Sequence, residues 1–119
     1  MLSNLVNEWP NYPNERRALP RYRFYARLEM ILGSKVRWGR VCNISEAGMC
    51  IATCEYLSVN TRFCGRLALE TPLPMECVVR WVVPGRGIGV TISFLCEEEK
   101  ARFYALLQAQ GKEAGERTL

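Results

Sequence analysis

Histidine is absent from the 119 residues of this chain. Its absence removes the commonest general base and both of the usual nucleophile pairs, Ser–His and Cys–His. Cysteines are present, but no two have the C-x-x-C spacing of a zinc site, and no histidine can complete a mixed site. The sequence therefore predicts no catalytic residue, no metal ligand and no cofactor.

Long apolar runs are also lacking. No segment approaches the roughly 20 apolar residues of a membrane-spanning helix, and the opening "MLSNLVNEWPNYPNERR" has no basic region followed by an apolar one, as a secretory signal would. We therefore expect a cytoplasmic protein without membrane insertion. In a reducing compartment the cysteines are expected to be small buried hydrophobic residues rather than disulfides. They are Cys42, Cys50, Cys54, Cys64, Cys77 and Cys96.

Positive charge is concentrated in the first third of the chain. The formal net charge is +4, yet the segment from Glu15 to Arg40 holds eight basic and two acidic residues, so it carries +6 and the remainder carries −2. Such asymmetry indicates an anionic partner for this segment. A nucleotide, a nucleic acid, an acidic protein or a membrane surface would each fit the charge alone.

Alternating polarity predicts an all-β fold. Over residues 21–31, apolar side chains alternate with charged ones, which is the period of a half-buried strand. Gly33 indicates a turn, and Gly39 a β-bulge in the next strand. In the fifth strand Trp81 shares a face with valines, so core packing is favoured over base stacking for its ring. The six expected strands cover 21–31, 36–42, 49–52, 61–70, 76–83 and 88–94.

Residues 96–111 change to helical spacing. Three glutamates suit a helix N-terminus, and Gly111 is the expected end of the helix. Short strands at regular spacing with antiparallel turns predict a six-stranded antiparallel barrel or sandwich, capped by one C-terminal α-helix. We expect one domain over 15–110, a mobile N-terminal tail over 1–14 leading into a flexible basic arm, and a C-terminal tail over 111–119.

The loop "NISEAG" after the second expected strand carries groups suited to reading the edge of a base. Asn43 offers amide donors and a carbonyl acceptor, Ser45 a hydroxyl, and Gly48 a backbone that a flat ligand can approach closely. The same residue types are common in plain turns, and arginines along one side of a strand are often a solvated face. Arg17 and Arg21 differ, because they flank the junction between the arm and the first strand.

Taken together, the two stretches resemble the PilZ domain family, the bacterial receptors of cyclic di-GMP. One family signature, Arg-x-x-x-Arg before the first strand, is matched by Arg17 to Arg21 in "RALPR". The other, [Asp/Asn]-x-Ser-x-x-Gly after the second strand, is matched by Asn43 to Gly48 in "NISEAG". The order of the motifs, the six-stranded pattern and the C-terminal helix make the match specific, and it covers 15–110.

The resemblance implies a set of ligand-binding residues. Arg17 and Arg21 would bind phosphate or guanine, since a planar guanidinium can do either bidentately. Asn43 and Ser45 would hydrogen-bond the ligand from the barrel surface, and Gly48 would leave room for it. Three further residues are secondary candidates: Arg40, close to the second motif, and Arg80 and Trp81, in the fifth strand, where a tryptophan also resembles the family.

Stoichiometry and mechanism also follow from the resemblance. In the family, an arginine just before the first motif goes with an intercalated nucleotide dimer, and Arg16 occupies that position, so two nucleotides per site are expected. The arginine arm would close over the nucleotide and create a new surface for an effector protein whose identity the sequence does not disclose. The chain is thus expected to be a non-catalytic receptor and adaptor.

Two other functions fit the sequence less well. One is a PilZ-fold interaction module that has lost nucleotide binding, which the intact motifs argue against. The other is a small basic barrel that binds single-stranded nucleic acid. Against it, the aromatic residues Tyr22 and Phe24 fall on the core side of the first strand rather than among the arginines. A homodimer, through an unpaired barrel edge or the last helix, is left open.

Overall fold

The computed structural model describes residues 21–118, with side chains to residue 110. The predictions made for the tail 1–14 and for Arg16 and Arg17 lie outside the described residues. Within residues 21–118, no cluster of metal-binding side chains is found, and no helix has the length and apolar composition needed to cross a membrane.

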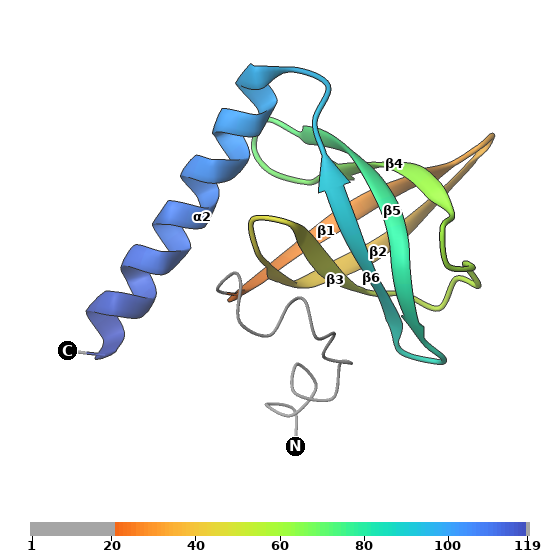
Figure 1. The fold of residues 1–119 in the computed structure, drawn as a ribbon, viewed down its shortest axis with the longest axis horizontal. Coiled ribbons are helices and arrows are strands. Elements are labelled where there is room, and N and C mark those ends of the chain that lie inside the picture. The colour runs from red at the N-terminus through yellow and green to blue at the C-terminus, as the bar shows by residue number, and fades with distance from the viewer. Residues whose placement is uncertain (1–20, 119) are drawn as a thin grey trace.

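Six strands form a closed antiparallel barrel in the order β1-β2-β3-β6-β5-β4 (Figure 1). The predicted fold class is therefore confirmed. The first and last strands of this order, β1 and β4, pair with each other and close the barrel. In the part of the chain that the structure describes, the barrel therefore has no unpaired edge strand through which a homodimer could form. The strands are β1 (Tyr22–Leu32), β2 (Lys35–Ile44), β3 (Gly48–Ala52), β4 (Arg62–Leu67), β5 (Leu73–Val83) and β6 (Gly87–Ser93).

Alternation of side chains fills the barrel interior. Along β1, Leu28 and Met30 are fully buried while their charged neighbours face outward, as the period of two predicts. Tyr22 and Phe24 pack against the same core, so their predicted orientation is confirmed. The turn expected at Gly33 forms, with this glycine in the left-handed region at φ 64°. A second turn forms at Gly85, where φ is 78°.

One helix, α2 (Glu97–Thr118), follows the last strand and leans away from the barrel toward its C-terminal end (Figure 1). Phe103 and Leu107 bury its first half against the core, with the Phe103 ring 5.3 Å from that of Phe94. The predicted end at Gly111 is wrong. A glycine inside a helix costs only about 1 kcal/mol relative to alanine, and no proline follows it.

Two further predictions are corrected by the register and the burial. Gly39 does not form a bulge, because it pairs regularly with Leu28. A Cβ at this position would lie 2.7 Å from the Ile51 side chain, so a glycine here avoids a clash. All six cysteines are free, but the prediction that they are buried holds only for Cys50 and Cys77. Cys42 and Cys64 are half-buried, and Cys54 and Cys96 are exposed because each follows the end of a strand.

Candidate functional site

A row of paired residues crosses the outer face of four neighbouring strands. Asn43 of β2 pairs with Cys50 of β3, Cys50 pairs with Gly89 of β6, and Gly89 pairs with Trp81 of β5. We call these four residues the site row. Cys50 and Trp81 form a small cluster separate from the main core, which places the row outside the barrel interior.

Two bulges decide which side chains belong to the site row. Between Val41 and Asn43 the β2–β3 register shifts by one residue, and between Val79 and Trp81 the β5–β6 register does the same. A bulge moves the next side chain to the other face of the sheet. Val79 therefore packs in the main core whereas Trp81, two residues later, faces outward.

Trp81 thus corrects the sequence analysis. The prediction of core packing rests on a face shared with the neighbouring valines, but the extra residue Arg80 turns Trp81 to the face opposite Val79. Val82 now packs inward and Val83 outward. The indole is still buried, with only 5% of the residue exposed. One side of its ring lies against Gly89, where a Cβ would be 2.0 Å from the ring.

Arg21 lies across the site row and contacts three strands. Its guanidinium donates a hydrogen bond of 2.9 Å to Asn43 Oδ1 and one of 3.4 Å to Cys50 Sγ. The same group is 5.8 Å from the centre of the Trp81 ring, within the range of a cation–π contact. The second arginine of the first motif and the asparagine of the second motif are therefore brought together, although 22 residues separate them.

The polar groups under Arg21 are buried and incompletely satisfied. Asn43 is 1% exposed, and among the described residues its Nδ2 has no hydrogen-bond partner. Burial raises the pKa of the Cys50 thiol to about 11, although the charge of Arg21 and the Asn43 amide oppose the shift. The thiol is therefore neutral at pH 7, and Arg21 supplies the charge above the site row.

Ser45 and Gly48 close the loop next to the site row. The Ser45 amide donates to the Gly48 carbonyl at 2.9 Å, and the Gly48 amide donates to Ser45 Oγ at 3.3 Å. Ser45 is 4% exposed. A Cβ on Gly48 would lie 2.1 Å from the Val90 carbonyl oxygen, so this glycine allows β3 to approach β6, and its expected role toward a ligand stays a prediction.

The secondary candidates lie at different distances from this arrangement. Trp81 belongs to the site row. Arg80, at the β5 bulge, is exposed and donates to Thr91 Oγ1 at 3.2 Å and to Asn60 Oδ1 at 3.3 Å. Arg40 is exposed on β2 and pairs with Arg27 rather than with any residue of the row.

Cys50 and Gly89 were missed as site residues. Cys50 looked like one of several small hydrophobic cysteines, and nothing in the sequence separates it from the others. Gly89 carried a usable signal, because a glycine inside a strand often marks a close approach of another group. That group is the Trp81 ring.

These features define a small antiparallel barrel with an arginine held over a buried, partly unsatisfied polar and aromatic row, an arrangement suited to an anionic ligand with flat groups. The family follows from comparison: the model of the PilZ domain matches residues 15–109. The chain belongs to the PilZ domain family, and the family predicted from the two motifs is confirmed.

Solved structures share the fold at low sequence identity. Over 87% of this chain and 98% of the other, the PilZ domain of Escherichia coli YcgR with c-di-GMP superposes with a TM-score of 0.65 and 15% identity. For the K. pneumonia MrkH complex with c-di-GMP, the TM-score is 0.71 and the sequence identity is 17% over 87% of this chain. The chain spans only 56% of the length of MrkH, about half. For the PilZ domain of CeSA, from a cellulose-synthesizing bacterium, the TM-score is 0.58 and the sequence identity is 17%. The match covers 80% of this chain and 98% of that domain. A comparison with curated proteins finds no significant match.

Proposed function

We propose that this protein is a non-catalytic receptor of cyclic di-GMP that binds the nucleotide over the site row. The observation that carries the proposal is the guanidinium of Arg21, held over Asn43, Cys50 and Trp81. The family membership supports it, as do the fold neighbours YcgR and MrkH, whose structures contain c-di-GMP.

The chemistry of the site row suits a dianionic dinucleotide. Arg21 presents one fixed positive charge, and a guanidinium bonds bidentately to phosphate oxygens or to the O6 and N7 atoms of guanine. The Trp81 ring beneath it is flat and apolar, and the thiol of Cys50 is neutral because burial raises its pKa to about 11, so neither adds a negative charge that would repel a phosphate.

The orientation of the Asn43 amide determines whether the ligand group that contacts it donates or accepts a hydrogen bond. An arginine has only donors, so the oxygen of the Asn43 amide must face Arg21. The nitrogen is then left to donate, and it is buried without a partner among the described residues. A ligand group that meets Asn43 is therefore an acceptor, such as a phosphate oxygen or the O6 or N7 atom of guanine in cyclic di-GMP.

The remaining parts of the proposal concern the arm, which lies outside the described residues, and the loop beside the site row. Arg17 would add a second guanidinium from the arm, and Arg16 predicts two nucleotides per site. Ser45 would supply a hydroxyl at the loop, and Gly48 clearance. Ordering of the arm over the barrel would then change the binding of an effector protein in the cytoplasm.

Isothermal titration of cyclic di-GMP into the wild type and Arg21→Ala tests the proposal. Charge-assisted hydrogen bonds contribute roughly 1.5 to 3 kcal/mol each, so the variant should lose at least about tenfold in affinity. Arg37→Ala is the matched control, because its guanidinium is paired with Glu55 at 3.3 Å, away from the site row. The control should bind like the wild type, with two nucleotides per chain.

Each departure from that result has a definite meaning. If the wild type takes up no nucleotide, the receptor function is wrong, and the protein is a PilZ-fold interaction module. Saturation at one nucleotide per chain contradicts the role assigned to Arg16 but leaves the receptor intact. Equal affinity for the wild type and Arg21→Ala would place the ligand away from the site row.

A further inference from the structure

The β1–β2 hairpin carries an exposed strip of aromatic and basic side chains that the nucleotide site does not use. Tyr25 and Arg27 of β1 and Trp38 and Arg40 of β2 face outward, with Tyr25 63% and Trp38 48% exposed. We call these four residues the hairpin strip. In Figure 1 the two strands run side by side and extend beyond the rest of the barrel.

Two like charges face each other in the hairpin strip. Arg27 and Arg40 are direct partners across β1 and β2, a placement that costs stability between antiparallel strands. Among the described residues, no ion pair joins either of them to a carboxylate, and the nearby Glu29 is bound instead by Arg66 at 2.9 Å. An anion placed between the two guanidinium groups would relieve this repulsion.

Aromatic rings lie on both sides of the arginine pair. The Arg27 guanidinium stacks over the Trp38 ring at 4.2 Å, in the Glu29–Trp38 register row just beyond the arginine pair. Tyr25 lies two residues before Arg27 on the other side. At about 3.3 Å per residue along a strand, the two aromatic positions are roughly 13 Å apart, with the backbone positions of the arginine pair between them.

We propose that the hairpin strip binds single-stranded nucleic acid. A phosphate lies between Arg27 and Arg40, and flanking bases stack on Trp38 and Tyr25, since base–aromatic stacking and backbone charge are the two means by which such surfaces bind. An acidic peptide would use the arginines but has no need of two exposed rings around them. This proposal does not depend on the nucleotide site.

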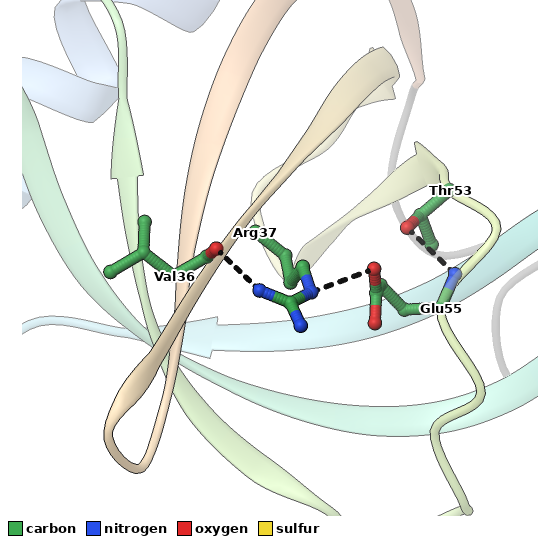
Figure 2. Close-up of polar contacts among 4 residues, drawn as sticks. All are labelled: Val36, Arg37, Thr53 and Glu55. Atoms are coloured by element: carbon green, nitrogen blue, oxygen red, sulfur yellow. Dashed lines mark hydrogen bonds and ion pairs between the residues drawn. The ribbon is translucent and has the colours of Figure 1, made fainter.

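The orientation of the aromatic residues removes the objection raised from the sequence. Tyr22 and Phe24 do face the core, but Tyr25 and Trp38, which alternate with the arginines, face outward. Neighbouring Arg37 stands apart from the strip: Figure 2 shows it turned toward Glu55 in the segment after β3, with a second hydrogen bond to the Val36 carbonyl. Its charge is therefore neutralised locally.

Fluorescence anisotropy with a labelled oligothymidylate of about 15 nucleotides, within the usual range of site sizes, tests the proposal on the full chain. The wild type should bind, with affinity falling as salt rises. Arg27→Ala combined with Arg40→Ala should reduce the slope of log K against log salt by roughly 0.7 for each phosphate that the protein no longer neutralises. Trp38→Leu should lose roughly tenfold in affinity, whereas Trp38→Phe keeps a ring and most of the binding.

Arg37→Ala is the control, because it removes one arginine from the same strand but one that Glu55 already neutralises, and binding should change less than about twofold. Each variant is first shown to be folded, with a urea midpoint no lower than that of the wild type. Absence of oligonucleotide binding by the wild type at low salt overturns the proposal, as does binding that the strip variants leave unchanged. Displacement by polyglutamate with no effect of Trp38→Leu would assign the strip to an acidic protein segment instead.

Discussion

Small side chains in the site row leave the space that Trp81 and Arg21 occupy. Gly89 has no Cβ, and the Trp81 indole occupies the space. Cys50 contributes a small sulfur that accepts from Arg21, where a larger side chain would push the guanidinium away. The positions of Arg21 and Trp81 therefore rest on the small size of their neighbours.

Gly89→Ala tests this dependence. The new Cβ, placed 2.0 Å from the Trp81 ring, must displace the indole, and overpacking of this kind costs roughly 1 to 3 kcal/mol. We expect a matching decrease in the free energy of unfolding in urea and weaker binding of cyclic di-GMP.

The control for Gly89→Ala is a double-mutant cycle with Trp81→Ala. Without the indole the added methyl group has room, so the alanine at position 89 should cost much less stability in that background. Equal costs in both backgrounds would show that the clash is with the backbone of β6 rather than with the ring.

At the scale of the strand, bulges and close approaches place the site residues. An extra residue in β2 and another in β5 turn Asn43 and Trp81 to the same outer face, and the turn from Ser45 to Gly48 sets β3 against β6. The binding surface is thus built by irregularities in otherwise regular strands.

Gly48→Ala should disrupt the pairing of β3 and β6. The added Cβ would lie 2.1 Å from the Val90 carbonyl oxygen, and backbone cannot yield as a flexible side chain can. We expect the free energy of unfolding to fall by about 2 kcal/mol or more, measured by urea denaturation. Nucleotide binding would then be abolished by unfolding of the loop rather than by removal of a group that binds the ligand.

Glu46→Ala, in the same loop but exposed, is the matched control and should stay within about 0.5 kcal/mol of the wild type. A Gly48→Ala protein with wild-type stability but without nucleotide binding would instead support the role of ligand clearance that the family motif implies.

For the molecule as a whole, buried thiols link stability to alkaline pH. Burial raises the pKa of Cys50 from 9.0 to about 11 and raises the pKa of Cys77 in the same direction. A raised pKa means that the folded state holds the proton more tightly than the unfolded state. The resulting stability is fully present below pH 9 and is lost as the pH rises toward the folded-state values.

Urea denaturation between about pH 8 and pH 10.5 measures this loss. Cys50 alone should account for about 2 kcal/mol over that range, at ~1.4 kcal/mol per unit of pH above the unfolded pKa. Cys50→Ala should show a shallower decrease with pH than the wild type, whereas alanine at the exposed Cys54 should leave the pH dependence unchanged. Identical decreases in Cys50→Ala and the wild type would contradict the assignment.

Much of the fold was predictable because its signals are local. Alternation along 21–31 and the turn at Gly33 are read within a few residues, and each reflects a steric preference that holds in any context. The two motifs predicted the family, and the contact between Arg21 and Asn43 agrees with them. The roles of Arg16, Arg17, Ser45 and Gly48 toward a ligand stay predictions.

The amino-acid sequence was enough to predict the number of strands and their approximate positions along the chain, the family, and the arginine and asparagine that meet at the site row. The folded barrel was needed to show that Trp81 faces outward, that Cys50 and Gly89 join the row, and that Trp38 lies beside two facing arginines. The physical reason is that a bulge depends on the register with a partner strand. One extra residue turns the side chains that follow it in the same strand to the opposite face, and the sequence of that strand alone does not show where the extra residue lies.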